Sequence, residues 1–521
     1  MIFRIILFAL ICLPISAFSS SVKVHERILK NGLKVLVKED HRSPVAVSQV
    51  WYKVGSSYEP NGITGVSHML EHMMFKGTEK YPAGEFSRII AENGGNENAF
   101  TGRDYTAYFQ TMEKSRLEVS FELEADRMRN LRLDPEELKK ELEVVTEERR
   151  MRTDDKPRSK TQEYFMAMAF TNSPYKNPVI GWPSDIANYQ VGDLQTWYER
   201  WYAPNNAILV VVGDVDPEAV LKLAKKYFGP LKPEVIVPPK PRIEPAQKGK
   251  RELTVKAPAE VPYTIMGYKA PVLSTAEEDW EPYALEVLAN VLDGGDSARL
   301  TRDLVRGSQI ATSAGAGYDL YDRQAGLFLL DGTPAGDSTV ADVQAALFEQ
   351  IQQLKDEPVT DKELTRIKSG VVASAVYELD SIFYQAMKIG QLEAVGLDWR
   401  LADEYVDRIN AVTAEQVQAV AKKYLVEEAL TVAVLDPLPM ETGREPRQAS
   451  NGGGHGHWNN DERMEDGRDA SVVVAGCHSG GVRHAGNTTL GNGQWGAGLF
   501  CAGTGITHGG YQRHLCSGRC A

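Results

Sequence analysis

A proline-rich segment divides this chain into two parts, and we expect each part to form a domain of its own. Six prolines fall within sixteen residues, at positions 230, 233, 238, 239, 241 and 245. Proline fixes φ and lacks a backbone N–H, so this run favours an extended spacer over a helix or a central strand. We therefore predict a linker at 230–250 between an N-terminal domain at 20–229 and a C-terminal domain at 251–437.

The two parts repeat one pattern. In each, a helix-like stretch is followed by an apolar strand that closes in Asp, and the spacing of Tyr202 to Asp214 equals that of Tyr424 to Asp436. Short β-branched or aromatic runs alternate with longer helical patterns throughout, and those of the first part lie at 35–37, 45–52, 105–111 and 207–212. We expect two copies of one mixed α and β unit.

The first residues are typical of an export signal. Arg4 precedes an apolar run of eleven residues, Ile5 to Ile15, and Ala17-Phe18-Ser19 offers a small-x-small cleavage site. A membrane-spanning helix needs about twenty apolar residues, so a signal peptide at 1–19 is favoured over a permanent anchor. The mature protein is expected in the periplasm or outside the cell, without a stable membrane anchor.

The last segment, 438–521, differs from the rest in being rich in Gly, His, Asn and Arg. This composition predicts a disordered tail. Metal binding by His455, His457 and the nearby cysteines, pairing of the cysteines after export, and a reading-frame artefact remain as alternatives.

Charge and cysteine content restrict the chemistry. A formal net charge of −13 argues against nucleic acid as a partner, since such proteins need a basic surface. Between Val22 and Pro437 there is no cysteine. A metal bound there needs His, Asp or Glu as ligands, and a cysteine nucleophile is excluded.

Two of the four histidines in this part, His68 and His72, stand four residues apart in His68-Met-Leu-Glu71-His72. The segment Thr64 to Phe75 predicts a helix with Thr64 as N-cap. Residues four apart share one helix face, so both imidazoles can reach one metal ion while Glu71 acts on its water. The alternative is a pair of surface histidines on an amphipathic helix.

A catalytic zinc site typically has three protein ligands and an open position. A carboxylate is the expected third ligand, and the richest source is the helix opened by Asp134-Pro-Glu-Glu, which runs to about Arg152. Glu141 and Glu148 lie two turns apart on one face of this helix.

The motifs His68-Met-Leu-Glu-His72, Gly94-Gly95-x-x-Asn98-Ala99-x-Thr101 and Glu141-x6-Glu148, in this order, resemble the pitrilysin/insulinase family of zinc metallopeptidases. The likeness covers about 22–437 and is strongest to short bacterial members related to mitochondrial processing peptidase. It implies an α+β fold of two homologous halves, each an antiparallel sheet flanked by helices, which close as a clam-shell in a dimer.

The resemblance also implies roles for single residues. Glu148 matches the third zinc ligand, Glu141 an acidic residue that supports the ligands, and Glu71 the general base of a zinc-dependent endopeptidase. The segment from Glu97 to Phe109 includes an edge strand that receives the substrate, with Asn98 and Ala99 near the scissile bond. From the residues alone, Asn98 is equally well read as a turn residue.

The second half departs from the family pattern of active members. Its counterpart to the metal-binding helix, Pro282 to Leu292, lacks histidine, so we expect one zinc per chain. Arg306 stands near the place of a substrate-gripping Arg, but Thr312 stands where a Tyr is expected, and Tyr318 and Tyr321 are nearby. A homodimer, or a heterodimer with a zinc-free homologous subunit that supplies the missing pair, is therefore expected.

Three rival interpretations remain open. The first is a non-catalytic or partner-dependent subunit of a peptidase-like heterodimer. The second is a periplasmic metal-binding protein that uses its tail, and the third is a hydrolase of another class. The last is disfavoured because there is no Gly-x-Ser-x-Gly motif.

Overall fold

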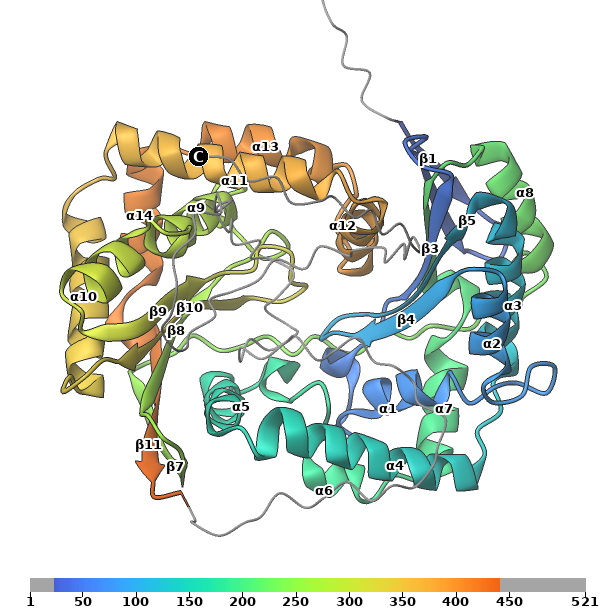
Figure 1. The fold of residues 1–521 in the computed structure, drawn as a ribbon, viewed down its shortest axis with the longest axis horizontal. Helices are drawn as coiled ribbons and strands as arrows, with labels where there is room; N and C mark the ends of the chain where they lie inside the picture. The colour runs from blue at the N-terminus through green and yellow to red at the C-terminus, as the bar shows by residue number, and fades with distance from the viewer. Residues whose placement is uncertain (1–22, 441–521) are drawn as a thin grey trace, which may run out of the picture.

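A computed structural model describes residues 23–440. The predicted signal peptide at 1–19 and the predicted tail from residue 441 onward lie outside these residues. The described part contains two sheets side by side, one from each half of the chain (Figure 1).

The first sheet has six strands in the order β1-β2-β6-β3-β5-β4, with β2 and β6 parallel and the other neighbours antiparallel. The strands are β1 (Val24–Ile28), β2 (Lys34–Glu39), β3 (Val45–Tyr52), β4 (Asn96–Thr101), β5 (Thr106–Glu113) and β6 (Ala207–Gly213). The central strand β6 is wholly buried and consists of an apolar run, as a strand covered on both faces requires. The short strand β4 forms one edge.

The second sheet repeats this topology. Its order is β7-β11-β8-β10-β9, which equals β2-β6-β3-β5-β4 when each strand is shifted by five, and β7 and β11 form the parallel pair. The strands are β7 (Arg251–Pro258), β8 (Tyr263–Ala270), β9 (Ala311–Gly317), β10 (Gly326–Pro334) and β11 (Leu430–Leu438). The shared order confirms the predicted architecture of two copies of one unit.

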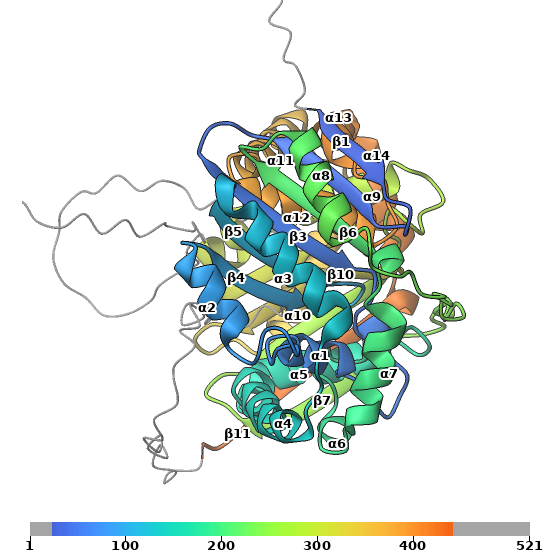
Figure 2. The same cartoon turned by 90° about the vertical axis from the view of Figure 1, so that its right-hand side faces the viewer.

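Some helices of each half pack on the sheet of their own half. Figure 2 shows α3 and α8 lying in front of the first sheet. The helices of the first half are α1 (Val66–Met73), α2 (Glu85–Glu92), α3 (Leu117–Asn130), α4 (Pro135–Arg149), α5 (Pro157–Ala169), α6 (Pro183–Ile186), α7 (Val191–Trp201) and α8 (Pro217–Tyr227). Those of the second half are α9 (Glu281–Asp293), α10 (Val340–Asp356), α11 (Asp361–Glu378), α12 (Ile382–Ala394), α13 (Leu401–Ala411) and α14 (Ala414–Tyr424).

Two helices are exchanged between the halves. Helix α5 of the first half packs on β7 and β11, where Phe165 and Ala169 join the apolar face of the second sheet. Helix α12 of the second half packs on β3 and β6, where Ala386 and Ile389 join Trp51. The inner face of each sheet is thus covered by a helix from the opposite half (Figure 1).

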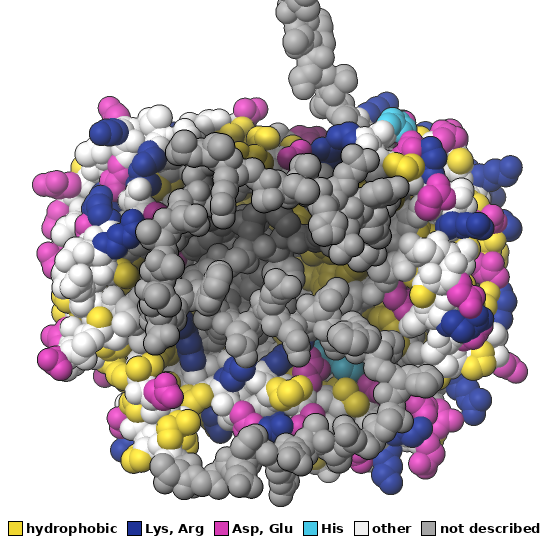
Figure 3. Space-filling view, in the orientation of Figure 1, with side chains coloured by type: hydrophobic (Ala, Val, Ile, Leu, Met, Phe, Trp, Pro, Cys, Tyr) yellow, Lys and Arg dark blue, Asp and Glu magenta, His cyan; other side chains and the backbone are white. Residues whose placement is uncertain are grey.

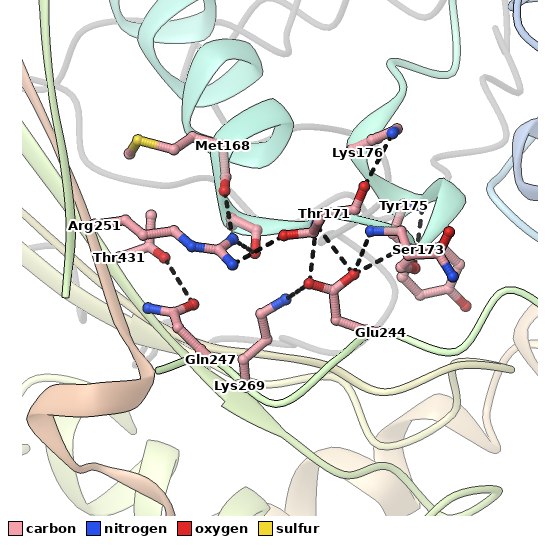
Figure 4. A network of polar contacts seen from close by, with 12 residues as sticks. Met168, Thr171, Ser173, Tyr175, Lys176, Glu244, Gln247, Arg251, Lys269 and Thr431 are labelled. Atoms are coloured by element: carbon pink, nitrogen blue, oxygen red, sulfur yellow. Dashed lines mark hydrogen bonds and ion pairs between the residues drawn. The ribbon is translucent and has the colours of Figure 1, made fainter. Parts of the chain in front are cut away.

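The segment between the halves, 230–250, has no helix or strand but is fixed by polar contacts (Figure 4). The carboxylate of Glu244 accepts hydrogen bonds from the backbone N–H groups of Thr171, Asn172 and Ser173, after the end of α5, and pairs with Lys269 of β8 at 2.7 Å. A largely buried carboxylate with four donors is well satisfied. Glu244 therefore links the segment to both halves.

The sequence placed four strands of the first sheet, β2, β3, β5 and β6, within two residues of their observed bounds, and these predictions are confirmed. The predicted start of the metal-binding helix is wrong. Thr64 does not cap α1, which begins after Gly65, a residue with φ of 86° and no capping side chain. The Thr64 hydroxyl instead donates to Asp185 at 2.6 Å. A threonine before an apolar run is also compatible with a tertiary contact, and here that contact replaces the cap.

Among the described residues, none of the helices is both long and apolar enough to cross a membrane.

We expect Gly390→Ala to destabilise the protein by about 1–3 kcal/mol, because overpacking a tight core costs this much. A Cβ at this position of α12 would lie 2.2 Å from the indole of Trp51, which is wholly buried. The control is Gly370→Ala in α11, where a Cβ meets no atom within 4 Å. It should stabilise by about 0.5–1 kcal/mol, since alanine is the better helix former. Urea denaturation measures both, and equal effects of the two changes would contradict the tight packing of α12 on the first sheet.

Candidate metal centre

Helices α1 and α4 bring together three side chains of the kinds that bind metals. One donor atom each of His68, His72 and Glu148 lies within 4.8 Å of the others. The Glu148 Oε2 atom is 3.6 Å from His68 Nε2 and 3.3 Å from His72 Nε2. Atoms bound tetrahedrally at about 2.0–2.2 Å from one ion lie about 3.3–3.6 Å apart, so the two separations measured from Glu148 fit a zinc ion.

The N-terminal end of α1 is held by a carboxylate from the preceding loop. Glu59 is fully buried and accepts hydrogen bonds from the backbone N–H groups of Gly65 at 2.6 Å and Ser67 at 2.9 Å. A carboxylate here satisfies free helix N–H groups and complements the helix dipole. Gly65 is required as well, because a Cβ would lie 2.4 Å from the carbonyl oxygen of Ile180.

Helix α4 presents Glu148 in its last turn, as the sequence predicted. Asp134 is its N-cap and accepts from the N–H of Glu136, and Pro135 occupies the first turn. The helix continues into a π-helical turn, Arg150–Asp154, from which Arg152 pairs with Glu148 at 2.8 Å. The predicted cap and the predicted extent to about residue 152 are confirmed.

Glu141 contacts His72 through the ring nitrogen that does not face Glu148. It accepts a hydrogen bond from His72 Nδ1 at 3.1 Å and pairs with Lys76. A carboxylate that binds one imidazole nitrogen fixes the tautomer and directs the other nitrogen to a metal. The two carboxylates thus flank the His72 ring.

The two histidines differ in charge state in the absence of a metal. Burial lowers the pKa of His68 to about 4, against the opposing effect of Glu148. Burial also disfavours charge on His72, but its contacts with Glu141 and Glu148 outweigh burial and raise its pKa to about 10. Burial alone would raise the pKa of Glu148, but His72, His68 and Arg152 lower it to about 2. A raised pKa favours the protonated form of His72, which lies between Glu141 and Glu148.

Glu71 points from α1 toward the end of β4. The hydroxyl of Thr101 donates to Glu71 Oε2 at 2.5 Å. Burial raises the pKa of Glu71 to about 7, although the charge of His72 and the Thr101 hydrogen bond oppose this. A carboxylate with a pKa near neutrality is suited to take up and release a proton.

The predicted substrate-binding residues on the first sheet lie on its edge. Asn98 and Ala99 belong to β4, so Asn98 is a strand residue and not a turn residue. Asn98 is exposed and its side chain accepts from the N–H of Ala99. Ala99 packs against the apolar core that includes α1.

The second half places its candidate residues differently. Arg306 is exposed in a π-helical turn, Leu300–Gly307, and pairs with Asp296 at 3.1 Å. Thr312 lies in β9, and its hydroxyl donates to the carbonyl of Thr333. Tyr318 and Tyr321 are buried after β9, outside any strand. Neither tyrosine is free to replace the one expected at position 312.

Helix α9 occupies the place of α1 in the second copy, since it follows β8 as α1 follows β3. The prediction of its position is confirmed. It repeats Leu70-Glu71 as Leu285-Glu286, with Tyr283 and Val287 in the positions of the two histidines. Glu286 is buried, and one of its oxygens has no hydrogen-bond partner among the described residues. The second copy therefore retains a glutamate at the position of Glu71 but has no histidine at the positions of His68 and His72.

Two residues near this centre were missed from sequence. Thr101 was part of the Gly94 to Thr101 motif, but only the structure shows its contact with Glu71. Glu59 precedes α1 by seven residues in a loop, and no pattern in the sequence marks it as a helix cap.

Comparison with known proteins identifies the family of this chain. Residues 34–182 match the family described as "Insulinase (Peptidase family M16)", and residues 188–371 match the "Peptidase M16 inactive domain". The zinc protease PqqE of Helicobacter pylori is 35% identical over 363 residues, which cover 68% of this chain and 80% of that protein. The chain belongs to the insulinase family of peptidases, family M16.

Other similar proteins include a second sequence relative and two solved structures. The uncharacterized zinc protease YmxG of Bacillus subtilis is 27% identical over 408 residues, 78% of this chain and 97% of that protein. The crystal structure of a Helicobacter pylori protease aligns with a TM-score of 0.76 at 31% identity and covers 80% of this chain and 100% of that one. The periplasmic protease PqqL of Escherichia coli aligns at 0.65 and 17% identity, over 80% of this chain and 48% of its own, which shows the fold alone.

We expect binding of a divalent metal such as zinc to the metal-free protein to release about one proton at pH 7, because a ligand imidazole must be neutral. His72, with a pKa of about 10, is the source. Its folded pKa is raised, so the metal competes with this proton below pH 10. Metal affinity should therefore rise roughly tenfold per pH unit.

Titration calorimetry in buffers of different ionisation enthalpy measures the released protons. The Glu141→Gln variant lacks one of the carboxylates that raise the pKa of His72, so it should release fewer. Release of no proton by the wild type at pH 7 would contradict the assignment.

Proposed function

We propose that this member of the peptidase family is a zinc-dependent endopeptidase that hydrolyses peptides or unfolded polypeptides. The observation that carries the proposal is the convergence of His68, His72 and Glu148 beside Glu71. The donor set itself also supports a metal, because two imidazoles and a carboxylate are typical zinc ligands and all three side chains are withdrawn from water. His68, His72 and Glu148 would hold one zinc per chain.

The proposed chemistry divides between the ion and the chain. When bound, zinc supplies Lewis acidity to the peptide carbonyl and lowers the pKa of the attacking water. Glu71 takes one proton from that water and passes it to the leaving amine. Thr101 holds the carboxylate of Glu71 in place at 2.5 Å, and Glu141 orients the ring of His72.

The substrate would bind as an added strand on β4. An edge strand offers unpaired backbone N–H and C=O groups, which an extended peptide can satisfy. This strand ends at Thr101, the residue that contacts Glu71, so a peptide paired with Asn98 and Ala99 would pass close to the metal. Its recognition would depend on backbone bonds more than on a single side chain.

The charges on one face of the molecule are mixed in sign. In Figure 3, basic and acidic side chains alternate around the rim of the described residues, with no continuous basic stripe on the face shown. This agrees with the formal net charge of −13.

The first test is Glu71→Gln. We expect the variant to keep one zinc per chain and to lose about 10²–10⁴ of kcat on a mixed peptide pool, the contribution of a general base. Zinc content by emission spectroscopy and peptide cleavage by mass spectrometry measure the two effects. The matched control is Glu143→Gln, an exposed residue of α4, which should leave both unchanged. Loss of zinc together with activity in Glu71→Gln would refute the separate role of Glu71.

A second candidate function is that of a partner-dependent subunit. The observation that favours it is Thr312 in the place of the expected tyrosine, with Tyr318 and Tyr321 buried. We propose that the chain acts as a dimer, either with itself or with a zinc-free homologous subunit. In the second case, the zinc-free subunit would supply the substrate-gripping arginine and tyrosine. This chain has Arg306 but no tyrosine at position 312.

The test of the partner is activity of the purified chain alone. We expect it to bind zinc but to cleave peptides weakly, and Thr312→Tyr to raise kcat/KM by about tenfold, the worth of one good contact. The control is Ser313→Tyr, which places a tyrosine at the adjacent exposed position of β9 and should leave kcat/KM unchanged. Full activity of the purified chain would exclude the need for another subunit.

We propose that the protein acts outside the cytoplasm, because a signal peptide is predicted at 1–19. The Escherichia coli relative of known fold is described as periplasmic, which agrees with this proposal. The competing idea of a metal-binding protein that uses its tail is separated by deletion of residues 441–521. Retention of one zinc would exclude it.

A further inference from the structure

One arginine of the second half contacts two segments of the first half that lead to the candidate metal centre. Arg323, in the loop before β10, donates from Nη2 to the hydroxyl of Ser57 at 2.7 Å and from Nε to Asp104 at 3.1 Å. Its guanidinium also lies 4.4 Å from the ring centroid of Tyr58. Asp104 is buried, so this ion pair is shielded from water and geometrically fixed.

The two segments that Arg323 contacts are joined to each other. The N–H of Ser57 donates to the carbonyl of Arg103 at 2.7 Å, and the N–H of Ser56 donates to that of Gly102 at 3.2 Å. Their backbones approach so closely that a Cβ at Gly55 would lie 2.4 Å from the Gly102 carbonyl oxygen. A displacement of one segment is therefore passed to the other.

Each segment leads directly to the proposed catalytic machinery. The first continues into Glu59, whose carboxylate caps the helix that carries His68 and His72. The second follows Thr101, which binds the carboxylate of Glu71. The segment between the halves adds Arg242, which donates to the carbonyl of Ser57 at 2.7 Å.

We propose that Arg323 is a positioning residue of the metal centre, through which the second half fixes the loop of Glu59 and the turn after Thr101. This inference rests on the proposed function. It gives the second copy of the fold, which lacks metal ligands, a role in catalysis within its own chain. It also makes closure of the two halves a condition for the correct placement of Glu71 against the metal.

The test compares Arg323→Met and Arg323→Lys with a matched ion pair elsewhere between the halves. Lys34 of β2 pairs with Glu393 of α12 at 2.7 Å, and the exposed fractions of the Lys34 and Arg323 side chains are similar, 22% and 26%. Lys34→Met is the control for the stability cost of losing one such pair. Zinc content, unfolding midpoint, kcat and KM are measured for all variants.

We expect Arg323→Met to keep its zinc and its KM within about twofold, and to lose about 10²-fold in kcat, as a misplacement of about 1 Å does. Arg323→Lys retains the positive charge but lacks the planar guanidinium, so its kcat should lie between those of the wild type and Arg323→Met. Lys34→Met should lower the unfolding midpoint comparably and keep the wild-type kcat. An equal kcat in Arg323→Met and wild type, or an equal loss in Lys34→Met, would overturn the inference.

Hydrogen exchange gives a reading that does not depend on activity. The N–H groups of Gly65 and Ser67 are held by Glu59, so they should exchange at least about tenfold faster in Arg323→Met than in Lys34→Met. Unchanged exchange there would overturn the positioning role. Failure of the proposed function looks different, because the wild type itself would then bind no zinc or cleave no peptide.

Discussion

The exchange of one helix from each half is the interaction on which the rest of the structure depends. Each sheet has two apolar faces, and helices of its own half cover only one of them. The other face would cost about 25 cal/mol for each Å² of apolar surface left in water. Helices α5 and α12 remove this cost by crossing to the opposite sheet. The position of the second half relative to the half with the candidate metal centre is fixed as a result, and contacts such as that of Arg323 become possible.

The metal centre shows how burial and charge are balanced in a small volume. Glu59, Glu71, Glu141 and Glu148 are all withdrawn from water around one short helix. A buried carboxylate is tolerated only when donors or cations satisfy it. Backbone N–H groups satisfy Glu59, and His72 and Lys76 satisfy Glu141. Glu71 has the hydroxyl of Thr101 as its donor, and this weaker satisfaction leaves it able to accept a proton.

Much of this arrangement was accessible from the sequence. The repeat was visible in the equal spacing of Tyr202 to Asp214 and Tyr424 to Asp436, because both copies end in a helix followed by a central apolar strand. The spacing of His68 and His72 follows from helix geometry, and Glu148 came from the resemblance to a family. The exchange of α5 and α12 was not accessible, because an amphipathic helix shows which face it buries but not which sheet it covers. The sequence likewise contains no pattern that singles out Glu59 or Arg323, and the partners of Arg323 lie far away along the chain.

The exchanged helices also change the meaning of the proline-rich segment. Its composition is that of a linker between two independent domains, yet each half contributes one helix to the core of the other. A protease that cuts once within 230–250 would leave two fragments that stay associated. Either fragment made alone would expose the apolar face around Trp51 or around Tyr263 and would be prone to aggregate. The halves are therefore one folding unit, held together by the exchanged helices and by the covalent linker. The packing of the helices contributes more to this association than the linker does.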